Sequence, residues 1–346
     1  MYLRAAATIS PPVSFEQILT ADSSAQSIRL ACAEPDYTKL IDPKMIRRMS
    51  RIVKMGVAAA LQCLDEAGDK MPDAIIAGTA YGCLGDTEVF LQKMVENDEQ
   101  LLTPTAFIQS THNTVAAQIA LLLKCHNYNN TFVQGGFSFE NAITDALSLL
   151  KEGQVKTVLA GGIDEITDTS HAILKRFGLY KRAPFATENI FQTQTKGTIA
   201  GEGATFFVMQ SGASGNDYAQ LKGFDTFYKP VSSKEVEQHI SAFLDRQNIK
   251  RSDIDLVISG ENGDIKNDEV YETIYQSALR GITHMPFKHL CGEYPTASAF
   301  ALWLAANIIK TGKLPSGLPS NKKPSTVLIY NHYRYTYHSL YFLNAC

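Results

Sequence analysis

The chain has 346 residues, of which 45% are apolar and 19% are charged, and its formal net charge is −3. This balance is typical of a soluble globular protein with a substantial core, built as one large α/β domain or as two joined halves. The small net charge argues against binding to nucleic acid or to an anionic membrane surface.

The cysteines and the apolar runs limit the class of protein further. The six cysteines are widely spaced and include no CxxC pair, which argues against a metal site and against a disulfide framework. We therefore expect no metal, no other cofactor and a reducing, cytoplasmic location. The longest apolar stretch, 300–309, has about half the length that spans a bilayer, so we expect no membrane insertion. The first ten residues do not resemble a secretory signal.

Helix and strand patterns alternate along the first part of the chain. Apolar residues three and four positions apart over 45–64 predict an amphipathic helix that ends at a glycine. Residues 73–78 and 158–160 predict strands that run into glycine turns, and 141–150 predict a helix. The apolar run at 204–210 is typical of the last strand of a first half.

A small and polar segment, 211–217, follows and is typical of a connector. Beyond it the alternation restarts, with helices, strands and a closing antiparallel strand pair expected at 234–243, 255–260, 267–279, 296–309, 327–330 and 340–343. The pattern therefore predicts two halves, 1–212 and 213–346, each built from strand, glycine turn and helix.

Five short motifs resemble those of the β-ketoacyl synthase family. They are the helix start at 47–51, a GT-x-x-G turn at 78–82, an interface-crossing segment at 110–118, an AGG-x-E-like turn at 160–164 and a DG-x-x-x-GEGA-like stretch at 197–204. Each motif is short, but their order and spacing extend the resemblance over nearly the whole chain. The resemblance implies a thiolase-like α/β fold of two pseudo-symmetric halves in α-β-α-β-α layers.

The resemblance also implies where the chemistry would lie. Condensing enzymes of this family hold the acyl chain on a cysteine and use two histidines, with a lysine beside the second. In this chain the strand-to-helix turn at 133–143 has Gly136 at the cysteine position. Gly260 occupies the first histidine position and Glu293 the second, while Lys288 is retained. We therefore expect a degenerate triad and no catalytic residue among these positions.

A condensing scaffold without its nucleophile indicates a chain-length-factor-type subunit. Such a subunit would pair with an active ketosynthase and shape its acyl tunnel in type II fatty-acid, polyketide or aryl-polyene synthesis, with acyl groups carried on acyl carrier protein. In the family, the interface-crossing segment lines the partner's tunnel, which here would involve Phe107, Thr111, His112 and Asn113. His112 could equally be a helix-start histidine with local hydrogen bonds. Gln134 is a further tunnel or interface candidate, although it falls two residues before the cysteine position.

Two other functions remain open from the sequence. One is an active acyltransferase or condensing enzyme that uses Cys291, with His289 nearby, or Glu293. The other is a homodimeric acyl-binding protein without chemistry. The basic residues at 47–54 are consistent either with a solvated face or with a landing site for an acidic carrier protein.

Overall fold

The computed structural model describes residues 1–346 apart from 13, 21–25, 194, 316, 317 and 319–322. Ten strands of this described part form the main sheet, in two sets of five. The first set is β1 (Tyr2–Ile9), β4 (Ala74–Gly78), β5 (Tyr128–Phe132), β6 (Thr157–Asp164) and β9 (Gly203–Gln210). The second set is β10 (Ala219–Tyr228), β11 (Leu256–Ser259), β12 (His284–Pro286), β13 (Thr326–Tyr333) and β14 (Tyr337–Asn344).

Both sets have the same topology. The order is β1-β9-β6-β4-β5 in one and β10-β14-β13-β11-β12 in the other. If the strands of each set are counted along the sequence, both sets place the first strand beside the fifth, followed by the fourth, the second and the third. In each set the first two of these pairings are antiparallel and the last two are parallel. The prediction of two pseudo-symmetric halves is therefore confirmed. The halves join where Tyr2 and Leu3 of β1 pair with Gln220 and Ala219 of β10.

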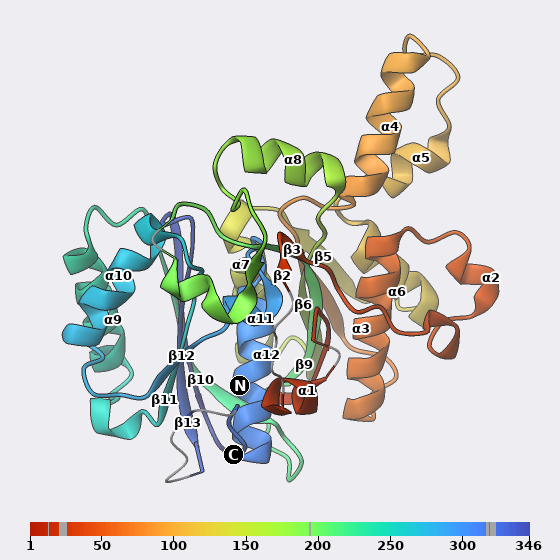
Figure 1. Ribbon diagram of the computed structural model, residues 1–346. Helices are drawn as coiled ribbons and strands as arrows, with labels where there is room; N and C mark the ends of the chain where they lie inside the picture. The colour runs from red at the N-terminus through yellow and green to blue at the C-terminus, as the bar shows by residue number, and fades with distance from the viewer. Residues whose placement is uncertain (13, 21–25, 194, 316–317, 319–322) are drawn as a thin grey trace.

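The helices form three layers around the strands (Figure 1). The outer helices α3 (Arg51–Ala67) and α6 (Thr114–Leu123) cover the first set of strands, and α9 (Ser233–Arg246) and α10 (Ile265–Gln276) cover the second. Between the two sets lie α7 (Ser138–Lys151) and α12 (Ser298–Thr311). This is the predicted α-β-α-β-α layering. Gly68 ends α3 in the left-handed conformation, at φ 66°, which glycine adopts without steric cost.

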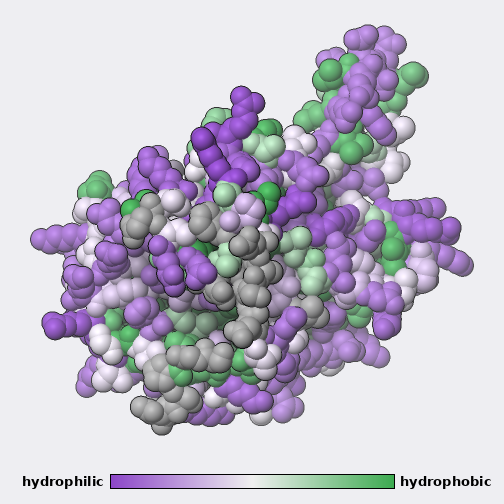
Figure 2. Space-filling model, viewed as in Figure 1, coloured by the Kyte–Doolittle hydropathy of each residue, from purple (hydrophilic) through white to green (hydrophobic). Residues whose placement is uncertain are grey.

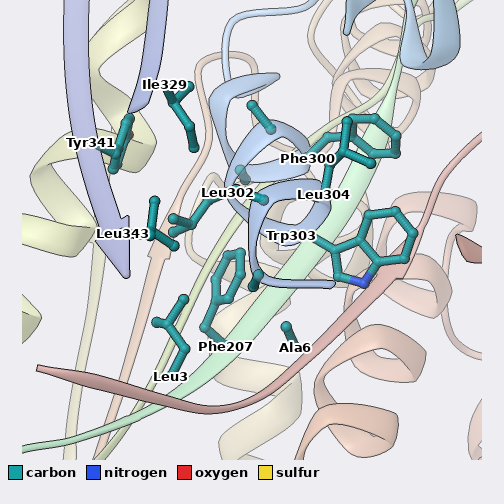
Figure 3. Packing of buried hydrophobic residues seen from close by; sticks show 14 of the residues in the cluster. Leu3, Ala6, Phe207, Phe300, Leu302, Trp303, Leu304, Ile329, Tyr341 and Leu343 are labelled. Atoms are coloured by element: carbon teal, nitrogen blue, oxygen red, sulfur yellow. The ribbon is translucent and has the colours of Figure 1, made fainter. Parts of the chain in front are cut away.

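The central helix α12 contacts both halves (Figure 3). Its Phe300, Leu302, Trp303 and Leu304 side chains lie among Leu3, Ala6 and Phe207 of the first half and Ile329, Tyr341 and Leu343 of the second. Burial of a side chain of this size contributes about 1.5–3 kcal/mol. The helix is apolar on most of its surface because sheets cover it on two sides.

Shorter elements complete the described chain. The helices are α1 (Phe15–Thr20), α2 (Pro43–Ile46), α4 (Leu84–Glu96), α5 (Pro104–Gln109), α8 (Asp168–Arg176) and α11 (Lys288–Cys291). The 3-10 turns are η1 (Tyr37–Lys39), η2 (Gly135–Phe137), η3 (Thr187–Gln192) and η4 (Arg251–Asp253). The small strands are β2 (Gln26–Ser27), β3 (Arg29–Leu30), β7 (Phe185–Ala186) and β8 (Ala200–Gly201). In the described part of the chain, no helix has the length and apolar character needed to cross a membrane.

Two sequence-based element assignments were wrong in detail. The helix predicted over 45–64 is divided, because Ser50 is extended (φ −68°, ψ 173°) and begins α3 as its N-cap. The strand predicted at 158–160 continues through Gly161 and Gly162 to Asp164, so these glycines lie in the strand and not in a turn. A glycine is needed at 161 because the Phe206 ring covers it and leaves no room for a side chain. Sequence patterns also missed β1 and β10, the two strands that join the halves.

Candidate functional site

The strand-to-helix turn at the cysteine position is closed. Gly136 is buried in η2, directly before α7. A Cβ atom built on it would lie 2.9 Å from the Cβ atoms of Tyr333 and Tyr337 and 2.9 Å from Cδ2 of Tyr337. Carbon atoms pack at about 3.5–4.0 Å, so even a methyl group would overlap these side chains. The turn itself is held by Ser138, whose hydroxyl accepts a hydrogen bond from the Gln134 N–H (2.9 Å) and donates one to the Gly135 carbonyl (2.8 Å).

The two tyrosines come from the tip of the β13–β14 hairpin. Residues 334–336 connect the two strands: Arg334 and Tyr335 have φ values of 55° and 51°, and the Thr336 N–H donates to the Tyr333 carbonyl over 3.1 Å. Two positive φ values are the geometry of a type I′ turn, which normally takes Asn-Gly. The Tyr333 hydroxyl lies 3.1 Å from the Tyr81 hydroxyl, and the Tyr337 ring contacts Phe137 edge-on, so the tip is fixed against the first half.

A buried ion pair occupies the second histidine position. The Lys288 ammonium donates to Glu293 Oε2 and to the His332 carbonyl, both over 2.8 Å. Asn262 Nδ2 donates to the same Glu293 oxygen over 2.5 Å. Burial raises the pKa of Glu293, and the Lys288 ammonium partly offsets this rise. Both donors hold Glu293 Oε2 as an acceptor, whereas the buried Oε1 has no hydrogen-bond partner among the described residues.

The loop at the first histidine position has no space for a side chain either. A Cβ atom on Gly260 would overlap Asn331 Oδ1 and lie 2.8 Å from the Tyr271 hydroxyl. The loop is stabilised by Asp268, which accepts hydrogen bonds from the Asn262 N–H (3.0 Å) and the Gly263 N–H (2.7 Å). Burial raises the pKa of Asp268 to about 7. Neighbouring side chains thus fill the space at Gly136 and Gly260, and Glu293 at the third position is held in a buried ion pair.

The structure does not bring Cys291 and His289 together as a nucleophile and base. Cys291 is fully buried in the central core, and its thiol donates to the Gly292 carbonyl (3.3 Å). Burial raises the pKa of this thiol well above its ordinary value, which opposes thiolate formation. The His289 ring contacts Phe191 edge-on, and burial lowers the pKa of His289 to about 4. Among the described residues, no hydrogen bond joins this thiol to that ring.

The tunnel and interface candidates lie on the surface of the isolated chain. Phe107, in α5, is 57% exposed, and His112 and Asn113 are exposed just before α6. The His112 ring lies against Gly82. The Thr111 hydroxyl donates to the Ile108 carbonyl and lies 3.0 Å from the Thr114 hydroxyl, so it is satisfied locally.

Gln134 is exposed, and its side chain accepts a hydrogen bond from the Asn141 side chain. Residues that sequence reasoning missed are Tyr333, Tyr337 and Asn262. The density of tyrosines over 330–341 was the available signal for the first two. No group of three or more His, Cys, Asp or Glu side chains in the described ranges is arranged to hold a metal ion.

Comparison with known proteins identifies the family of this chain. A family model described as the beta-ketoacyl synthase N-terminal domain matches residues 22–237. A putative polyketide beta-ketoacyl synthase 1 of Streptomyces virginiae is 21% identical over 280 residues, covering 71% of this chain and 66% of the relative. The 3-oxoacyl-[acyl-carrier-protein] synthase 2 of Synechocystis is 24% identical over 203 residues, covering 55% of this chain and 48% of the relative. The matched regions thus span about half to two thirds of these relatives.

Solved structures show the same fold. The ishigamide ketosynthase/chain length factor has a TM-score of 0.79 at 17% identity, with 100% of this chain and 98% of that chain covered. A ketosynthase in complex with its chain length factor from Xenorhabdus doucetiae has a TM-score of 0.76 at 15% identity, with the same coverage. The family match extends over more than half of the residues and agrees with the ordered motifs and the duplicated topology, so this chain belongs to the β-ketoacyl synthase family.

Proposed function

We propose that this chain is a non-condensing, chain-length-factor-type subunit. It pairs with an active ketosynthase and shapes the tunnel that limits chain growth in type II fatty-acid, polyketide or aryl-polyene synthesis. The observation that carries the proposal is the filled space at Gly136, where Tyr333 and Tyr337 exclude any nucleophilic side chain. A scaffold that has replaced its reactive centre by packing is suited to binding and shaping rather than to acyl transfer.

The comparisons support the pairing. Two similar solved structures are described as a ketosynthase with a chain length factor, and a third as a ketosynthase with its acyl carrier protein. We therefore propose an active ketosynthase as the partner in a heterodimer and acyl carrier protein as the source of acyl groups. The two halves of the subunit divide at 212/213, within the segment between Gln210 at the end of β9 and Ala219 at the start of β10.

An open sheet edge offers a place for the partner. Strand β5 is the last strand of the main sheet, and Tyr128 and Asn129 are exposed there. An unpaired edge strand readily accepts a strand of another chain. The exposed Phe107, His112 and Asn113 come, with Thr111, from the segment that we propose lines the partner's tunnel, and Gln134 is a further interface candidate.

A catalytic role for Cys291 or Glu293 is the weaker alternative. Such a role needs an accessible thiolate or a free proton donor, whereas Cys291 is fully buried and Glu293 is engaged by Lys288 and Asn262. We also propose a cytoplasmic location, because all six cysteines are free, as expected in a reducing compartment. The acyl-binding homodimer remains an alternative that the experiment below separates.

The test is a comparison of the purified subunit alone with the subunit co-expressed with an intact ketosynthase of the same organism. Alone, the protein should gain no covalent acyl group from acyl carrier thioesters and should not condense malonyl units, as read by intact-protein mass spectrometry and product analysis. Together, the two chains should co-purify in equal amounts and form product. Turnover by the single subunit, or failure of the pair to form, would contradict the proposal.

A further inference from the structure

The helices α4 and α5 project from the body of the molecule as an arm, residues 84–109 (Figure 1). In α4 the buried side chain is that of Phe90. Six of the fifteen large hydrophobic side chains that are exposed in the described chain lie in this arm, at Val89, Leu91, Val95, Leu101, Phe107 and Ile108. Scattered exposed apolar residues are normal, but such a concentration in 26 residues marks an interaction site.

The arm is also acidic. It contains five acidic residues and one basic residue, Lys93, which gives the arm a net charge of −4 (one minus five). The whole chain has a net charge of −3, so the remaining residues together carry +1. The carboxylates alternate with the apolar residues along the arm, at Asp86, Glu88, Glu96, Asp98 and Glu99. Figure 2 shows hydrophobic side chains of the arm surrounded by hydrophilic ones.

The root of the arm is fixed to the body. The Gly85 N–H donates to Glu165 Oε1 (2.9 Å), and the Thr167 hydroxyl donates to Glu88. Phe90 contacts Phe107, with ring centroids 5.7 Å apart, and so holds α4 against α5. These contacts make the arm a rigid projection, which lowers the entropy that a docking surface loses on binding.

The far end of the arm presents an apolar residue within an acidic turn. Asp98, Glu99 and Leu101 have positive φ values of 48°, 62° and 54°, which are uncommon for residues other than glycine. Leu101 is 91% exposed. On α4, Leu91 and Val95 are one helical turn apart and therefore share a face. The arm thus offers apolar side chains on two elements with carboxylates between them.

We infer that this arm docks into an apolar groove bordered by lysine and arginine on the ketosynthase subunit. The inference rests on the proposed function for the identity of the partner. It adds which segment of this chain binds and what kind of surface on the partner it contacts. Apolar burial provides the affinity, while the carboxylates select a basic border and accelerate association. A second copy of this chain is the poorer match, because its body offers a net charge of only +1 to an arm of −4.

The experiment measures binding of the full-length subunit to an intact ketosynthase of the same organism, by surface plasmon resonance and analytical ultracentrifugation. One variant removes the apolar pair (Leu91→Ser with Val95→Ser), and a second reverses the charge (Glu96→Lys with Glu99→Lys). The matched control is Ile173→Ser with Phe177→Ser, because these side chains, in α8 and at its C-cap, are 49% and 77% exposed outside the arm. Thermal melts of all variants confirm folding.

The apolar variant should weaken the complex at least tenfold, mainly through faster dissociation. The charge variant leaves the arm with no net charge (−4 plus 4), so it should slow association at least tenfold at low salt and remove most of the salt dependence of the rate. The control should stay within twofold of wild type. If wild type binds and the arm variants match the control, the inference is overturned while the proposed function stands. If wild type forms a homodimer that the arm variants dissociate, or binds no ketosynthase at all, the assigned partner is wrong.

Discussion

Restoring the missing cysteine should not restore chemistry. In a Gly136→Ala variant the added methyl lies 2.9 Å from three carbon atoms of Tyr333 and Tyr337, several tenths of an ångström inside normal contact. Both tyrosines are on the hairpin tip, so relief requires movement of β13 and β14. Overpacking of this kind costs about 1–3 kcal/mol of unfolding free energy. Gly136→Cys adds a sulfur to the same space and should cost at least as much.

Urea denaturation measures this cost against a glycine with free space around it. No atom lies within 4 Å of a Cβ built on Gly212, so Gly212→Ala should change the unfolding free energy by less than about 0.5 kcal/mol. Adding Tyr337→Ala to Gly136→Cys should recover part of the loss, with a coupling energy of at least about 1 kcal/mol. Intact-protein mass spectrometry after incubation with an acyl thioester should detect no adduct on Gly136→Cys alone.

A Gly136→Cys protein as stable as wild type that accepts an acyl group would refute the packing argument. The tyrosines would then have to move aside without cost, and the turn would be an open pocket. A stable variant that stays unacylated would refute only the predicted loss of unfolding free energy.

Three further predictions concern the buried polar groups. Glu293→Ala should lower the unfolding free energy by about 3–5 kcal/mol because it leaves the Lys288 ammonium buried and unpaired, whereas Lys288→Met with Glu293→Leu should cost far less. Burial holds the pKa of His338 at about 3, below the ordinary 6.5, so the unfolded chain binds the extra proton first. Acidification from pH 7 to pH 5 should therefore remove about 2 kcal/mol of stability through this group, and His338→Phe should lose that dependence. Iodoacetamide should label the exposed Cys346 in the native protein but Cys291 only after unfolding.

Each of these predictions has a contradicting result. For the ion pair, an equal loss of unfolding free energy in the single and the double variant would mean that removing Glu293 does not leave Lys288 as a costly unpaired charge. For His338, wild type and His338→Phe with parallel stability–pH curves between pH 7 and pH 5 would show that the ring titrates normally. For the cysteines, labelling of Cys291 at the rate of Cys346 would show an accessible thiol and would revive the acyltransferase alternative.

The fold class could be predicted from the sequence because the motifs that resemble the β-ketoacyl synthase family lie at strand ends. The glycines near 78, 136 and 162 and the acidic pair at Asp164 and Glu202 recur in a fixed order, and order survives when identity is low. The degenerate positions Gly136, Gly260 and Glu293 were likewise evident, since a missing side chain is visible without coordinates.

The filling of the empty positions could not be predicted. The strands predicted at 327–330 and 340–343 were shorter than the observed β13 and β14, because the turn between them lacks the usual Asn-Gly signal. Tyr333 and Tyr337 were therefore assigned to a loop. Their contact with Gly136 spans about two hundred positions, a distance over which periodicity gives no information. Asn262 was missed for the same reason, because its partner Glu293 lies on another element.

The position of α12 has a consequence for how the molecule can be divided. This helix belongs to the second half, yet it supplies the middle layer for both, with Phe300 and Trp303 beside strands of the first. A fragment ending at 212 would keep α7 but lose α12, which would expose the inner faces of β1 and β9 to water, and it would aggregate or stay molten. The duplicated topology therefore describes two repeats that share one interior, so the first repeat cannot be separated from α12 without losing part of its core.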